Sequence, residues 1–229
     1  MDWTWLPRYL PLLPYGIFVT LQLVVFTMVF GLILAVPIGL VQVTGPKWLA
    51  CIARAYCTFM RGTPLIIQLY LFYFGLGSVF AAYPELRQTF IWPVLKEGYY
   101  YAIVAFVLNE AGYAGEILRG AFLSVPKGEL EAARAFGMSP FQVLMRVWLP
   151  RALRNALPSL DNEVVQTLKS TPLAALVTVT DLFSVADRVR QETYIIYPPL
   201  IMVMVIYMAL TFIISRITTY LEMQVPTRR

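Results

Sequence analysis

Residues 128–160 read GELEAARAFGMSPFQVLMRVWLPRALRNALPSL, a charged and amphipathic stretch in the middle of an otherwise apolar chain. The chain has 229 residues, of which 59% are hydrophobic and 14% are charged, and its mean hydropathy is +0.68. A soluble domain of this length is roughly one quarter charged. The composition therefore predicts an all-α protein that crosses a membrane several times, with the quoted stretch outside the bilayer.

Five stretches are apolar and long enough, at about 20 residues or more, to cross a bilayer as helices. The predicted spans cover residues 15–43, 52–82, 99–123, 158–180 and 197–221. Together they form a predicted membrane domain, 15–221, flanked by the terminal segments 1–14 and 222–229 and interrupted by a long connection, 124–157. An odd number of spans places the two termini on opposite sides of the membrane.

The distribution of Lys and Arg predicts the orientation, because the cytoplasmic loops of membrane proteins carry an excess of both. If the N-terminus lies outside, the cytoplasmic segments hold most of the basic residues, including Lys127 and the arginines that follow it within 124–157. The outer segments then hold few basic residues, beside as many acidic ones. We therefore predict an outer N-terminus, a cytoplasmic C-terminus and a cytoplasmic connection at 124–157.

Several classes of function are excluded by what the sequence lacks. It has no histidine, so imidazole serves neither as a base nor as a metal ligand, and it has no GxxxxGKS or GxxxxGKT phosphate-binding loop. Cys51 and Cys57 lie six residues apart, which is not a metal-binding spacing. The net charge of +5 does not indicate nucleic-acid binding, because the basic residues fall between hydrophobic runs. We expect no catalytic residue, metal or cofactor in this chain.

The quoted stretch predicts two short helices outside the bilayer. Glu129 suits the first turn of the first helix, where the helix dipole favours acids, and Gly137 suits its end. The second helix has an apolar stripe over residues 141–148 and is expected to break at Pro150. From periodicity alone, the segment is an elbow on the lipid headgroups, with its arginines meeting lipid phosphate or a protein.

The spacing of certain residues in this elbow favours another interpretation. Glu131-Ala132-Ala133 is followed by three residues, Gly137, nine residues and then VWLP at 147–150. This pattern resembles the EAA signature of ABC importer permeases, which is EAA, three residues, G, nine residues and I-x-LP, with Val147 replacing Ile. FMRGTPLIIQLYLFYFGL at 59–76 and LNEAGYAGEILRGAFLSVPKGELEAARAFGMS at 108–139 also resemble the polar amino-acid permeases for histidine, lysine and arginine or for octopine and nopaline.

The resemblance implies a five-helix type I importer subunit in the bacterial inner membrane, which carries out transport and is not itself an enzyme. It also implies two ATPase subunits that hold ATP and Mg²⁺, a periplasmic solute-binding protein and a second permease. The second permease is either an identical chain or a sister chain, and the resemblance to heterodimeric permeases favours the sister chain. Residues 1–14 would then lie in the periplasm. Contact with the ATPase is implied for the signature residues, namely Glu131, Ala132, Ala133, Gly137, Leu149 and Pro150.

Ionisable residues inside the spans gather in the third and fourth, and such residues usually mark an aqueous path. Glu163, Gln166, Thr167 and Ser170 have offsets of 0, 3, 4 and 7, so they form one stripe of the fourth helix. Glu163 is a candidate contact for a cationic substrate, whereas hydrogen bonding between helices explains the two hydroxyl residues better. The predicted path comprises Glu163, Gln166, Thr167, Ser170, Asn109 and Glu110.

Three questions remain open at this stage. Asn109 either lines the path or caps a local break, and Lys169 is a possible ion-pair partner for Glu110 or Asp161. Gly62 and Pro64 predict either a simple kink where the second span enters the membrane, with Arg61 at the headgroups, or a break that exposes backbone carbonyls and amides to a polar substrate. The simple kink is the favoured interpretation. A secondary transporter driven by an ion gradient, and a membrane scaffold without transport, are the alternative functions. No internal sequence repeat supports the secondary transporter.

Overall fold

The computed structural model describes residues 4–224, which form helices and connecting turns without a strand. Residues 1–3 and 225–229, at the ends of the expected terminal segments, lie outside the described residues. The α-helices are α1 (Leu6–Tyr9), α2 (Leu13–Thr44), α3 (Lys47–Gly62), α4 (Leu65–Tyr70), α5 (Gly77–Ala81), α6 (Trp92–Leu95), α7 (Gly98–Leu123), α8 (Lys127–Ala135), α9 (Pro140–Val143), α10 (Leu149–Ser170), α11 (Leu182–Thr193) and α12 (Tyr197–Gln224). Short 3₁₀ or π segments complete the set, namely η1 (Leu10–Leu12), η2 (Leu71–Leu76), η3 (Pro84–Gln88), η4 (Leu144–Trp148) and η5 (Thr171–Val177).

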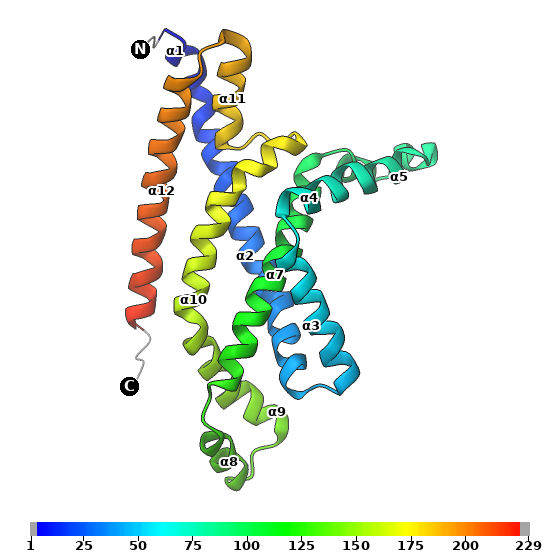
Figure 1. The fold of residues 1–229 in the computed structure, drawn as a ribbon, viewed down its shortest axis with the longest axis vertical. Helices are drawn as coiled ribbons and strands as arrows, with labels where there is room; N and C mark the ends of the chain where they lie inside the picture. The colour runs from blue at the N-terminus through cyan, green and yellow to red at the C-terminus, as the bar shows by residue number, and fades with distance from the viewer. Residues whose placement is uncertain (1–3, 225–229) are drawn as a thin grey trace.

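Four long helices, α2, α7, α10 and α12, run along the length of the molecule (Figure 1). The elements α8 and α9 lie at one end of this bundle, α1 and α11 lie at the other, and α4 and α5 project sideways as an arm. Glycines let the backbones of α2 and α7 approach closely. A Cβ atom on Gly39 would stand 3.0 Å from the Gly115 carbonyl oxygen, and one on Gly115 would stand 2.9 Å from Ile38.

The first, third and fifth expected spans correspond to the single helices α2, α7 and α12. By length and composition, two stretches of the described residues suit a membrane span, Leu6–Thr44 and Tyr197–Tyr220, and a bent helix pair adds a third. The helices α7 and α10 carry ionisable residues along their length. This is the composition expected of helices that face a polar path rather than lipid on every side.

The second expected span, 52–82, is not one helix. Lys47–Gly62 and Leu65–Ala81 are two helical pieces that meet at an angle of 101°. The break falls at Thr63 and Pro64, because Pro64 has no N–H to continue the hydrogen bonds of α3 and its ring disfavours a helical conformation in the preceding residue. The kink expected from Gly62 and Pro64 is therefore a full change of direction.

The fourth expected span, 158–180, also differs from the structure. The helix α10 begins at Leu149 and ends at Ser170, where a 3₁₀ segment continues to Val177. The expected break at Pro150 is wrong, because the chain stays helical through this proline, which follows Leu149 and the π turn Leu144–Trp148. The preceding π turn, Leu144–Trp148, joins α9 to α10 without an interruption.

Candidate functional site

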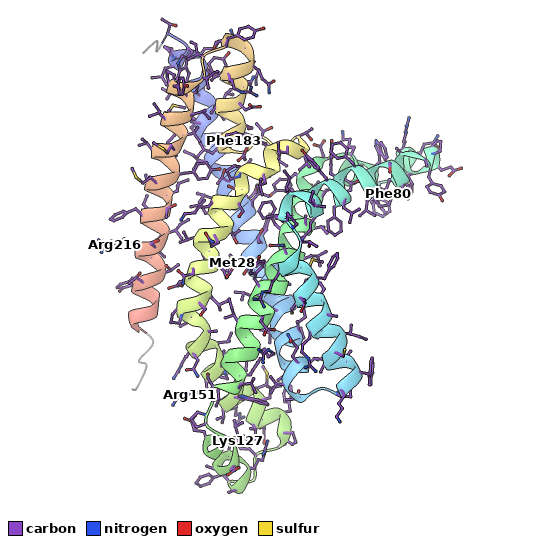
Figure 2. All side chains as sticks on the ribbon, in the orientation of Figure 1. Met28, Phe80, Lys127, Arg151, Phe183 and Arg216 are labelled. Carbon is purple, nitrogen blue, oxygen red and sulfur yellow. The ribbon has the colours of Figure 1, made fainter. Side chains whose placement is uncertain are left out.

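A cavity of about 430 Å³ lies among α2, the α3–α4 break, α7 and α10. Met28, which neighbours the cavity-lining residue Thr27, marks a position about halfway along the bundle (Figure 2). All six residues of the predicted substrate path line this cavity: Asn109, Glu110, Glu163, Gln166, Thr167 and Ser170. The structure thus brings the polar stripe of α10 against the polar residues of α7, while contact with a substrate stays a prediction.

Glu110 is the most deeply buried acidic residue of the cavity, with 4% of its surface exposed. Its Oε2 atom accepts a hydrogen bond from the Thr167 hydroxyl at 3.4 Å, whereas its Oε1 atom has no hydrogen-bond partner among the described residues. Gly31 on α2 makes room for this side chain, since a Cβ at Gly31 would stand 2.7 Å from the Cγ of Glu110. The Thr167 hydroxyl joins α7 to α10, as expected of a hydrogen bond between helices. The same expectation is wrong for Ser170, whose hydroxyl donates to the Gln166 carbonyl of its own helix at 2.9 Å.

Asn109 caps the break between α3 and α4, as one of its two interpretations predicts, and it also lines the cavity, whereas its contact with a substrate stays a prediction. Pro64 cannot donate to the carbonyl oxygen of Met60, four residues earlier. That oxygen instead accepts from the side-chain amides of Asn109, at 3.2 Å, and Gln68, at 3.0 Å. Gln68 also donates to the Thr63 carbonyl at 3.2 Å and accepts from Asn109 at 3.1 Å.

Gln68 is a site residue that the sequence analysis missed. It is buried within an apolar run, and its amide satisfies backbone groups freed by the nearby proline. The available signal was an isolated amide side chain four residues after Pro64, which is the distance of one helical turn. A bent helix inside a bilayer needs such donors, because water is not there to supply them.

Arg61 lines the cavity, and its predicted position at the headgroups stays a prediction. Its guanidinium carbon is 5.8 Å from the ring centre of Tyr113, and its carbonyl oxygen accepts from the Tyr113 hydroxyl at 3.4 Å. Lys169, in contrast, is exposed, and the expected ion pair between it and Glu110 is absent from the described residues. The cation beside the cavity carboxylates is therefore Arg61.

The expected ATPase contacts lie at the end of the bundle that carries α8. Gly137 ends α8 with a φ of +79°, and the chain closes there through hydrogen bonds from Gly137 N–H to the Arg134 carbonyl, at 2.9 Å, and from Met138 N–H to the Ala133 carbonyl, at 3.2 Å. Such a left-handed cap favours glycine. Among the signature residues, the exposed ones are Glu131, Ala132 and Gly137.

Ala133, one of the signature residues for which contact with the ATPase is implied, is buried within this chain. It is buried in a hydrophobic cluster with Leu118 and Phe122 of α7, and Leu149 packs against the same cluster. Its small side chain allows α8 to pack against its own chain, because alanine occupies the inner side of an amphipathic helix there. Pro150 is half-buried as well.

Two further contacts fasten the elbow to the bundle (Figure 2 labels Arg151 close to Lys127). The indole N–H of Trp148 donates to the Phe122 carbonyl at 3.0 Å. Arg151 donates to both carboxylate oxygens of Glu129, at 2.9 and 3.1 Å, so it does not stand free for lipid phosphate. The hydrogen bond from Arg151 is the main reason why the pKa of Glu129 lies below its ordinary value.

Phe136 and Phe141 were missed as surface contacts. They flank Gly137 and the turn between α8 and α9, and 87% and 70% of their surfaces are exposed. Exposed aromatic side chains on a polar element are typical of protein contact sites. The signal was present in the sequence as two phenylalanines on either side of the signature glycine.

This chain is similar in sequence to a known family and to several named proteins. A family described as binding-protein-dependent transport system inner membrane component matches residues 27–225. The octopine transport system permease protein of Rhizobium radiobacter is 40% identical over 93% of this chain and 86% of its own length. The histidine/lysine/arginine/ornithine transport system permease protein of Salmonella typhimurium strain LT2 is 35% identical over 87% of this chain and 83% of its own length.

A solved structure agrees with these sequence relatives. The crystal structure of an amino acid ABC transporter with histidines contains a chain with a TM-score of 0.81 and 28% identity, covering 98% of this chain and 99% of that one. The similarity therefore extends over the cavity and the elbow together. The chain belongs to the family of binding-protein-dependent transport system inner membrane components.

Proposed function

We propose that this chain is one of two permease subunits in an ATP-driven importer of polar amino acids, with basic amino acids or opines as substrates. One observation carries the proposal: a polar cavity lies about halfway along the bundle, and the elbow projects from the end of the bundle, away from this cavity. The names of the relatives, which specify octopine and basic amino acids, support the substrate class. The proposed location is the bacterial inner membrane.

The elbow and the cavity are connected by one continuous helix, α10, which has Pro158 in its interior. Arg151, near the start of α10, is bonded to Glu129 of the elbow, and Gln166, near the end of the same helix, lines the cavity. Fifteen residues of helix separate them, which is about 22 Å at 1.5 Å per residue. A movement of α8 is therefore transmitted along α10 to the polar stripe, without a nucleotide site in this chain.

Each proposed partner would meet a different part of this chain. One of the two ATPase subunits, which bind ATP and Mg²⁺, docks on the exposed side of α8 and on the two exposed phenylalanines beside it. A second permease, proposed as a sister chain, completes the translocation path, and a periplasmic solute-binding protein delivers substrate. In the proposed orientation the N-terminus is periplasmic, the C-terminus and elbow are cytoplasmic, and lipid surrounds the exposed apolar side chains.

ATP-dependent uptake in proteoliposomes tests this proposal. Glu131→Lys reverses an exposed charge on α8, so we expect the complete transporter to lose uptake while this chain still inserts into the membrane. Glu85→Lys is the matched control, because it reverses an exposed charge in η3, at a distance from the elbow, and should retain uptake. Full uptake by Glu131→Lys, or solute accumulation by this chain without a partner polypeptide, would refute the proposed coupling.

A further inference from the structure

The cavity holds charges of both signs, contributed by three helices. Glu110 comes from α7, Glu163 from α10 and Arg61 from the end of α3. Arg61 is the cationic residue of the lining within the described part of the chain, and no ion pair with it occurs there. A guanidinium next to a cavity, without a carboxylate partner of its own, is available to an anionic group of a ligand.

The three charges differ in how far the chain covers them. Arg61 is exposed, Glu163 is half-buried and Glu110 is buried. Glu163 lies within electrostatic range of both of the others. In order of burial, a positive group therefore comes first, and the two carboxyl groups follow it.

The deep end of the cavity has polar atoms that the chain leaves without partners. Glu110 Oε1 and Thr27 Oγ1 are buried and make no hydrogen bond within the described residues. Buried polar atoms are almost always satisfied, so two of them beside one cavity indicate a missing donor. The cationic end of a ligand, which carries several N–H groups, supplies such donors.

We propose that Arg61 binds the carboxylate of the substrate and so determines how a basic amino acid lies in the cavity. The α-ammonium group then lies beside Glu163, and the cationic end of the side chain reaches Glu110 and Thr27. This inference rests on the proposed function and assigns the substrate an orientation. The order of charges in a basic amino acid, one negative followed by two positive, is complementary to that of the cavity.

The position of Arg61 suits a planar carboxylate. Its guanidinium lies against the Tyr113 ring, which restricts its orientation. A guanidinium presents parallel donors that match the two oxygens of a carboxylate, whereas a lysine ammonium acts as a point charge. The cavity volume of about 430 Å³ is within the range for small-ligand sites, about 300–1,000 Å³, and accommodates one amino acid.

The test is equilibrium binding to the complete purified transporter in nanodiscs without the solute-binding protein. The probes are L-arginine, agmatine, which lacks the carboxylate, and citrulline, which lacks the side-chain charge. Arg61→Gln should weaken arginine binding about 10- to 100-fold, the range for losing a charged hydrogen-bonded pair, and leave agmatine binding unchanged. Arg61→Lys should restore part of the arginine affinity.

The control is Arg54→Gln, two helical turns earlier in α3, where the guanidinium donates to its own helix at the Ala50 carbonyl. It should bind all three probes like the parent. Equal weakening of arginine and agmatine by Arg61→Gln, in a transporter that still copurifies as a complex, would overturn the proposed orientation alone. If the parent transporter shows no ATP-driven uptake, the proposed function itself is overturned.

Discussion

The glycine that ends α8 should tolerate substitution far less well than the glycine that lies near its start. Gly137 has a φ of +79°, and no atom lies within 4 Å of the position that a Cβ would occupy. Alanine there therefore meets no clash, and its cost is that of a left-handed backbone, about 1–2 kcal/mol. That energy corresponds to about a 5- to 30-fold increase in the equilibrium constant for opening of the turn.

Gly128 is the matched comparison within the same helix. A Cβ at this position also meets no atom within 4 Å, but the residue lies in the first turn of α8 without a positive φ. Gly128→Ala should therefore stabilise α8 by about 0.5–1 kcal/mol, because alanine loses less backbone freedom on folding than glycine. The two glycine-to-alanine changes are thus expected to have opposite signs.

Hydrogen exchange of the purified transporter measures both changes at the amides that close the turn. These are the N–H groups of Phe136, Gly137 and Met138, which donate to carbonyls of α8. Gly137→Ala should accelerate their exchange about 5- to 30-fold, and Gly137→Asn should do so less, because asparagine tolerates the left-handed region. Slower exchange in Gly137→Ala, or the same acceleration in Gly128→Ala, would refute the conclusion that the positive φ of Gly137 is what makes its substitution unfavourable.

Two further changes test the elbow and the cavity. Glu129→Gln removes a carboxylate whose pKa is lowered by Arg151, and this stabilisation exists above the ordinary glutamate pKa of about 4.3 and disappears as the pH falls through the lowered value. The variant should therefore have a lower Tm than the parent at neutral pH, and the difference should narrow as the pH falls below about 4.3. A difference that stays constant as the pH is lowered would contradict this. Gly31→Ala places a Cβ 2.7 Å from the Cγ of Glu110, so it should destabilise the protein by about 1–3 kcal/mol in a detergent unfolding titration. Gly120→Ala is the control, because a Cβ there meets no atom within 4 Å and should not destabilise the protein. Equal stability of the two variants would count against close packing at Gly31.

Much of the fold follows from local sequence pattern. The long apolar runs predict α2, α7 and α12, since a helix is the form in which a single segment satisfies its own backbone in lipid. The polar offsets 0, 3, 4 and 7 also place the stripe of α10 on one side, because helical periodicity is a local property. The four path residues of α10 accordingly line one cavity, whereas Asn109 and Glu110 of α7 join them there only because the two helices pack together.

Other features depend on contacts between segments far apart in the chain. The sequence predicts a kink at Pro64, but the direction of the chain beyond it depends on where Asn109 and Gln68 hold the freed carbonyl oxygen of Met60. Likewise, the burial of Ala133 depends on which side of α8 meets α7. Neither result is encoded in the spacing of neighbouring residues.

By itself, the sequence determined the class of protein, the long helices and the position of the elbow, because apolar length and helical period act within one segment. The tertiary structure alone decided that Arg61 joins Glu163 and Glu110 at one cavity and that Arg151 belongs to Glu129. The physical reason is that charges interact through space. Which of them become neighbours is settled only when α3, α7 and α10 have packed together.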